Sequence, residues 1–243
     1  MDAFAIEPAW LDVTRHDLAI ERLPLALDGF SIAHVTDAHL RSMGRVELGI
    51  IEAVRQSQIQ LVVLTGDIVD RPESLAVLAE LCSGLRAAGA AVVATLGNWE
   101  HWGGFTALGL AHEYARTGAS LLVNECADVG GVVVAATDDG YAGAPRWDQT
   151  LASLAKLDTK GAPRLLLTHS PAMFEQLPFE APRFDLSIAL LGNLTENDLR
   201  MMREMRLDFN LYVLGESVPV QLSQQAQAQR LLENFRRYFN ESS

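Results

Sequence analysis

The sequence predicts an α/β protein built on a parallel sheet, and two features predict it. Residues 61–64 are four consecutive apolar residues that end at a Gly66-Asp67 turn, which is typical of a strand buried on both faces of a parallel sheet. Apolar runs of this kind then alternate with helix-like patterns, as in βαβ units. Ligands of open α/β sheets bind outside the carboxyl ends of the strands, so Asp67 is the first candidate for a functional site.

Composition narrows the class of protein and its partners. The chain has 243 residues, of which 49% are hydrophobic and 21% charged, enough for one substantial core. A net charge of −12 argues against a broad surface for nucleic acid or anionic lipid. Two cysteines and an N-terminus without a basic segment or a long apolar run predict a reduced, cytoplasmic chain without a membrane anchor. No feature of the sequence specifies an oligomeric state.

The first half of the chain predicts strands and helices in alternation. Apolar and polar residues alternate over 9–28, which predicts one or two opening edge strands. The next run, 30–36, predicts a strand that delivers Asp37 and His39 at its end, with His34 expected to pack within the strand. Apolar spacing over 45–58 predicts a helix before the strand at 61–64.

Further elements follow in the same manner. Residues 72–74 open a helix that ends near Gly89, and 91–96 form a strand that stops at Gly97-Asn98. Residues 130–137 predict another strand, and 147–157 another helix. Without an internal repeat or a linker, the chain is predicted to be a single domain over 1–243.

Three consecutive predicted strands end in side chains that can bind a metal: Asp37 with His39, then Asp67, then Asn98. Aspartate and asparagine oxygens with histidine nitrogens suit Mn, Fe or Zn. A bridging Asp67 would hold two ions about 3.5–4 Å apart, the spacing used for displacement at phosphorus. Each residue alone is more simply a turn or cap residue. The repetition over three strands favours the metal site.

These residues resemble a known family. Thr36-Asp37-Ala38-His39, Gly66-Asp67-Ile68-Val69-Asp70 and Gly97-Asn98-Trp99-Glu100 look like the first three blocks of the calcineurin-like metallophosphoesterases, and 23–30 is similar to the YkuE-like branch of bacterial phosphodiesterases. Residues 165–171, with His169, match the fourth block. The resemblance covers about 1–186 and implies a four-layer α/β/β/α sandwich with a dimetal site at the sheet ends.

The resemblance also implies a role for each matching residue. Asp37 and His39 would hold one metal, Asn98 and His169 another, and Asp67 would bridge them. One or two divalent ions (Mn, Fe or Zn) would activate water to hydrolyse a phosphomonoester or phosphodiester, so the expected partner is a phosphorylated small molecule.

Two departures from the family pattern bear on activity. Trp99 stands where the family commonly has a histidine, and His101, two residues on, is the candidate catalytic group. In place of the family's Gly-His-x-His block the chain has 191–195, where Asn193 can offer an oxygen. Residues 187–243 diverge from the family, and Glu196, Asp198 and Glu216 are further possible donors there. These departures favour an alternative function, a catalytically weakened or inactive member acting as a binding or regulatory module.

Overall fold

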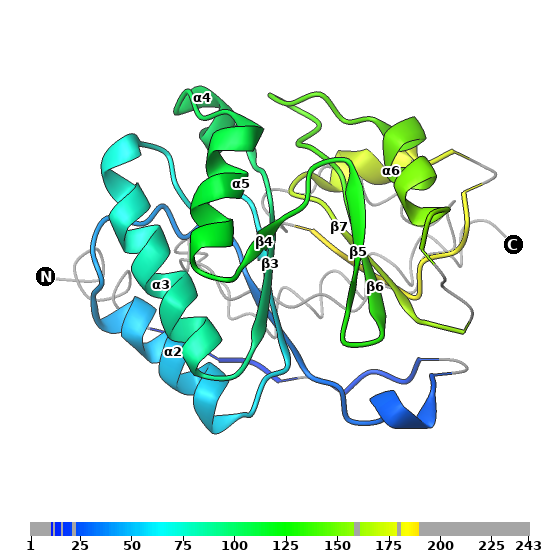
Figure 1. Cartoon of the computed structure of the whole chain (residues 1–243), viewed down its shortest axis with the longest axis horizontal. Coiled ribbons are helices and arrows are strands. Elements are labelled where there is room, and N and C mark those ends of the chain that lie inside the picture. The colour runs from blue at the N-terminus through cyan, green and yellow to red at the C-terminus, as the bar shows by residue number, and fades with distance from the viewer. Residues whose placement is uncertain are drawn as a thin grey trace, which may run out of the picture. The chain divides into compact units, whose positions relative to one another are not determined.

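Two four-stranded sheets dominate the part of the chain that the computed structural model describes (Figure 1). That part comprises residues 11, 13–15, 17–20, 23–157, 161–178 and 181–189, all within the compact unit Leu11–Gly215. The first sheet runs β1-β2-β3-β4, and all of its pairs are parallel. The second runs β5-β6-β7-β8, antiparallel between β5 and β6 and parallel thereafter. The bounds of the strands are β1 Ile32–Val35, β2 Leu61–Thr65, β3 Ala91–Thr95, β4 Ser120–Leu121, β5 Glu125–Val129, β6 Val132–Ala136, β7 Arg164–Leu167 and β8 Leu186–Ile188.

Helices cover the outer face of each sheet (Figure 1). Strands of the first sheet follow one another in chain order, and because parallel crossovers are right-handed, their connecting helices all lie on one face. The opposite face is therefore free to pack against the second sheet, whose outer face carries α6. The helices are α2 Arg45–Gln56, α3 Leu75–Ala87, α4 Asn98–Trp102, α5 Ala107–Arg116 and α6 Trp147–Leu154, with 3-10 turns η2 Leu25–Leu27, η3 Pro72–Ser74 and η4 Pro171–Gln176.

Three hydrophobic clusters separate the layers. Strand β2 is buried along its whole length, and its alternate residues point to opposite faces. Val62 and Leu64 belong to the cluster beneath α2, α3 and α5, whereas Leu61 and Val63 belong to the cluster between the sheets. A third cluster, which includes Trp147, lies between the second sheet and α6. The predicted four-layer α/β/β/α sandwich is confirmed.

The predicted opening strands are wrong for the described residues of 9–28. None of these residues forms a strand, and Leu25–Leu27 is instead a 3-10 turn that begins after Pro24. The apolar alternation has another cause: Leu25 is exposed while Leu27 is buried, because a single tight turn places them on opposite sides. The predicted strands at 30–36, 61–64, 91–96 and 130–137 are present with slightly different bounds. The predicted divergence of 187–243 falls almost entirely outside the described residues.

The parallel register brings the strand ends of both sheets to one edge. Val35 pairs with Leu64, and Thr65 pairs with Thr95. The two sheets are joined there by a hydrogen bond of 2.7 Å from the Thr95 hydroxyl to the backbone oxygen of Thr137, directly after β6. The segments that follow β1, β2, β3, β6 and β7 therefore leave the sheets at the same edge.

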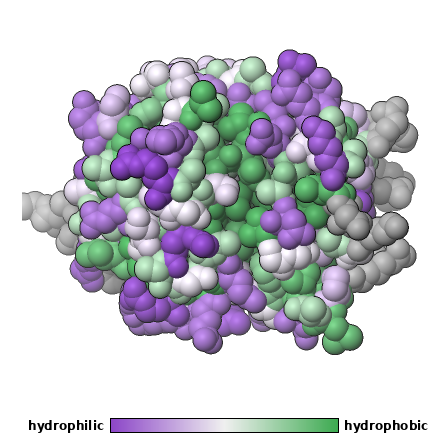
Figure 2. Space-filling view, viewed as in Figure 1, coloured by the Kyte–Doolittle hydropathy of each residue, from purple (hydrophilic) through white to green (hydrophobic). Residues whose placement is uncertain are grey.

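The surface is mixed in polarity. In the view of Figure 2, hydrophobic residues gather along the middle of the face, between the helices of the first sheet and the β5–β6 hairpin, with hydrophilic residues around them. Within the ranges given above, no helix has both the length and the apolar character that crossing a membrane requires.

Candidate metal centre

The backbone adopts an uncommon conformation at the ends of β1 and β2. Asp37, His39 and Asp67 have positive φ angles of 53°, 40° and 55°, a region that residues other than glycine seldom occupy. Hydrogen bonds across the two segments hold this conformation: Asp37 N–H donates to Gly66 O at 3.1 Å, and His39 N–H donates to Asp67 O at 3.0 Å. Strain of this kind concentrates at functional sites, and here it falls on three predicted metal ligands.

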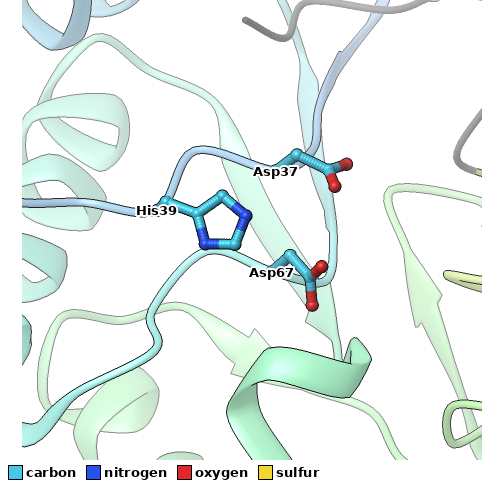
Figure 3. Close-up of side chains that lie close together, drawn as sticks. All are labelled: Asp37, His39 and Asp67. Atoms are coloured by element: carbon cyan, nitrogen blue, oxygen red, sulfur yellow. The ribbon is translucent and has the colours of Figure 1, made fainter. Parts of the chain in front are cut away.

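These three side chains converge on one point. Asp37, His39 and Asp67 each offer a ligand atom, and the three atoms all lie within 4.8 Å of one another. Figure 3 shows the side chains close together after β1 and β2, with the carboxyl groups of Asp37 and Asp67 extending in the same direction. The group therefore has the donors and the spacing to hold a divalent ion.

Asn98 and His169 join this group through Asp67. His169 Nε2 lies 3.3 Å from Asp67 Oδ2 and 3.1 Å from Asn98 Oδ1. The other ring nitrogen, Nδ1, lies 2.8 Å from the backbone oxygen of Thr65, so Nδ1 carries a proton and Nε2 faces the carboxylate. Asp67 is thus the residue that connects the group from the first sheet with His169 from the second.

Negative charge accumulates at this point. Burial raises the pKa of Asp37, against a hydrogen bond from the Thr36 hydroxyl, and the charge of Asp67 raises it further. Burial alone would lower the pKa of His169, but its hydrogen bond to Asp67 and the charges of Asp67 and Asp37 raise that pKa to about 9. Two partly desolvated carboxyl groups that draw a proton onto a buried histidine are an environment that favours a cation. The donor set therefore fits Mn, Fe or Zn.

Glu100 holds the loop that carries Asp67. This side chain is buried, and its carboxylate accepts backbone N–H groups from Asp67 at 2.8 Å, Ile68 at 2.7 Å, Val69 at 3.1 Å and Gly97 at 2.9 Å. Burial raises the pKa of Glu100, and these N–H donors oppose the rise. One carboxylate thus fixes both the turn after β2 and the start of α4.

Two glycines permit the close approach of these segments. A Cβ atom on Gly66, whose φ is +88°, would lie 2.6 Å from the Cα of Gly97 and 2.8 Å from His169 Nδ1. A Cβ atom on Gly97 would lie 2.6 Å from the backbone nitrogen of Asp67. Since real Cβ atoms do not make contacts this short, the Gly before Asp67 and the Gly before Asn98 are both required by packing.

Comparison with known proteins agrees with this geometry. The family model for calcineurin-like phosphoesterase matches residues 30–198, which include every described candidate ligand. The chain belongs to the calcineurin-like phosphoesterase family. It is also 29% identical over 176 residues to the uncharacterized metallophosphoesterase YkuE of Bacillus subtilis (strain 168). That match covers 68% of this chain and 59% of the relative, so the chain spans less than two thirds of the relative's length.

Trp99 and His101, the two unusual residues in and after the third block, have different surroundings. The backbone N–H of Trp99 donates to Asp67 Oδ1 at 2.8 Å, while the indole ring of Trp99 is exposed. His101 Nε2 lies 2.7 Å from Asp138 Oδ1, in the segment after β6. His101 is not one of the three described residues whose ligand atoms converge. Its imidazole extends from α4 to the Asp138 carboxylate, which orients the ring.

Asp70 is a further residue of the second block with a place at the site. Its Oδ2 lies 3.6 Å from His39 Nδ1, and the Arg41 guanidinium donates to both of its carboxylate oxygens at 2.6 and 2.5 Å. The hydrogen bond from Arg41 lowers the pKa of Asp70. A carboxylate beside a metal-binding imidazole orients the ring and raises its basicity.

The structure brings together five of the six candidate ligands of this family member. Asn193 lies outside the described residues, as do Glu196, Asp198 and Glu216. Sequence reasoning missed the roles of Glu100 and Asp70. Glu100 follows Gly97 by three residues, which is the spacing of a capping box. This pattern predicts the hydrogen bond from the Gly97 N–H to Glu100, but not the hydrogen bonds from the Asp67 loop.

Proposed function

We propose that the chain is a metal-dependent phosphoesterase that hydrolyses a phosphomonoester or phosphodiester. The observation that carries this proposal is the convergence of Asp37, His39 and Asp67 within 4.8 Å at the strand ends of a member of the calcineurin-like phosphoesterase family. The connection of Asp67 to His169 and Asn98 supports a second ion in the same site.

In this proposal Asp37 and His39 would hold one ion, Asn98 and His169 would hold the other, and Asp67 would serve both. Asn193 would add an oxygen donor, and the chain would take one or two ions of Mn, Fe or Zn. When bound, such ions supply an acidic water as nucleophile and positive charge for the phosphoryl oxygens.

The chain's own residues supply orientation and a proton. Glu100 fixes the Asp67 carboxylate through the backbone N–H of the same residue, and Asp70 steadies the His39 ring. We assign to His101 the transfer of a proton to the leaving oxygen, with Asp138 orienting its ring through the 2.7 Å contact at Nε2. The substrate is a phosphorylated small molecule rather than nucleic acid, since the net charge of −12 disfavours a polyanion. The cytoplasm is the proposed location.

The experiment is an assay of p-nitrophenyl phosphate and bis(p-nitrophenyl) phosphate, after removal of metal by chelation and addition of Mn. Asp67→Asn should lower hydrolysis about 100-fold, because it removes the proposed bridging carboxylate. Asp148→Asn is the matched control, since Asp148 is an exposed residue of α6 whose carboxylate pairs with Arg146, and it should leave the rate unchanged.

One observation favours a second function. Trp99 occupies the position after Asn98, and the N–H of its exposed indole ring donates hydrogen bonds but is too weakly acidic to protonate a leaving group. The second function is a binding or regulatory module. It would be favoured over the enzyme if the folded protein binds Mn and a phosphorylated compound but hydrolyses neither ester.

A further inference from the structure

Three aromatic side chains extend from the metal centre along the surface. Trp99 and Trp102 belong to α4, and Tyr141 follows β6; we call these three residues the aromatic ladder. The Trp99 ring meets the His39 ring edge to face, with centroids 5.6 Å apart and planes at 88°. Trp99 meets Trp102 at 5.2 Å and 80°, and Trp102 meets Tyr141 at 5.7 Å and 82°. The ladder is thus continuous with a candidate metal ligand.

The ladder is exposed although its members are large. The exposed fractions of Trp99, Trp102 and Tyr141 are 43%, 54% and 79%. Other large exposed hydrophobic residues of the described chain are aliphatic, so the exposed aromatic surface is gathered at this one place. Aromatic surface left open beside a catalytic centre is characteristic of a ligand site.

Hydrogen bonds fix the ladder relative to the metal centre. The backbone N–H of Trp99 donates to Asp67 Oδ1 at 2.8 Å, and α4 begins at Asn98, itself a candidate ligand. At the far end, the N–H groups of Tyr141 and Ala142 donate to the buried carboxylate of Asp139 at 2.8 and 2.6 Å. The rings therefore stand on two anchored segments, so that a group bound on them has a defined position relative to the ions.

The chemistry of the ladder selects a planar ring. Aromatic faces bind other π systems by stacking, and this is tolerant of which ring is bound. The net charge of −12 disfavours binding of a long nucleic acid. The ligand that fits is therefore a small molecule in which one planar ring is attached to one phosphoryl group. Resting on the proposed function, we propose that the aromatic ladder binds the planar aromatic ester group of the substrate, an aryl ring or a nucleobase, while its phosphoryl group lies at the metal centre.

Phosphonates that resist hydrolysis test this inference by titration calorimetry on the full-length, Mn-loaded protein. Methylphosphonate, cyclohexylphosphonate and phenylphosphonate share the anionic group but differ in the attached group, and an acyclic adenine phosphonate represents a nucleobase. The variants are Trp102→Ala, Trp102→Phe and, as a matched control, Leu108→Ala at another exposed position on α5. Trp102 is exposed and is not a candidate ligand, so its replacement should leave folding and Mn content intact.

The phenyl or the adenine compound should bind about tenfold more tightly than the cyclohexyl and methyl compounds, as expected for one stacking contact. Trp102→Ala should abolish this difference, while Trp102→Phe and Leu108→Ala keep it. A tighter adenine compound identifies a nucleobase, and a tighter phenyl compound identifies a simple aryl group. Equal affinity for the phenyl, adenine and cyclohexyl compounds would overturn the inference. Failure of methylphosphonate to bind would instead count against the proposed function.

Discussion

The replacement of Glu100 by glutamine tests how the metal centre is built. Oε1 of Glu100 accepts the N–H groups of Ile68 and Val69, and Oε2 accepts those of Asp67 and Gly97. Glutamine keeps one acceptor oxygen and turns the other into an NH₂ group. Two of the four buried N–H donors therefore lose their acceptor and face another donor.

The magnitude follows from these contacts. A buried donor without an acceptor costs about 1–3 kcal/mol, so two of them cost about 2–6 kcal/mol. Because burial raises the pKa of Glu100, the neutral glutamine also avoids part of the desolvation of a carboxylate, which offsets some of this loss. We expect a net destabilisation of about 2–3 kcal/mol, a large share of the total of about 5–15 kcal/mol that is usual for a folded domain.

Urea unfolding of chelator-treated protein measures this difference, and Mn titration measures its effect on the site. Because the Asp67 turn loosens, the Mn affinity of Glu100→Gln should fall about 10- to 100-fold, as for other residues that orient metal ligands. Glu52→Gln is the control, since Glu52 is exposed on α2 and lies outside the segments that carry the candidate ligands. A loss of less than about 1 kcal/mol with unchanged Mn affinity would show that Glu100 does not hold the Asp67 turn.

Three further predictions concern Asp70, His169 and His101. Asp70→Asn should weaken Mn binding about tenfold, because the Asp70 carboxylate no longer orients the His39 ring. Calorimetric Mn titration measures this affinity, and an unchanged value would show that Asp70 only pairs with Arg41 and Arg71. In chelator-treated protein the pKa of His169 lies at about 9, above its ordinary 6.5, because Asp67 and Asp37 outweigh burial; its contribution to stability is therefore full below pH 6.5 and lost as pH rises through about 9. Urea unfolding from pH 6 to 10 should show this decline, and His169→Asn should show none; parallel curves would reject the pairing. His101→Ala should lower kcat about 100-fold for an alkyl phosphate and much less for p-nitrophenyl phosphate, whose leaving group needs no proton; equal losses for both would exclude proton transfer by His101.

The sequence predicts the frame of the site because that frame depends on local patterns. The apolar run at 61–64 marks β2, and the turn residues after each predicted strand mark where the candidate ligands lie. Parallel pairing then brings Asp37, Asp67 and Asn98 to one edge without further information. Asp37, His39 and Asp67 converge as expected from this parallel pairing.

What the sequence does not predict are features set by tertiary contact. Three of the four N–H groups that Glu100 accepts lie over thirty residues away from it, and no local pattern relates these three to Glu100. The positive φ angles of Asp37 and His39 depend on cross-strand bonds to the Asp67 segment. The alternation over 9–28 predicts strands that the described residues of this range do not form, and Leu25–Leu27 is a tight turn that begins after Pro24. The contact of His101 with Asp138 likewise joins the ends of two different sheets.

The metal content per chain shows whether the residues around Asp67 form a metal site. Full-length protein is stripped by chelation, loaded with Mn, desalted and measured by elemental analysis beside Asp67→Ala and the control Asp148→Asn. We expect between one and two Mn per chain in the unmodified protein and in the control, and loss of the metal in Asp67→Ala. A folded, unmodified protein that retains no Mn, or an Asp67→Ala variant that retains as much as the control, would contradict a metal centre built around Asp67.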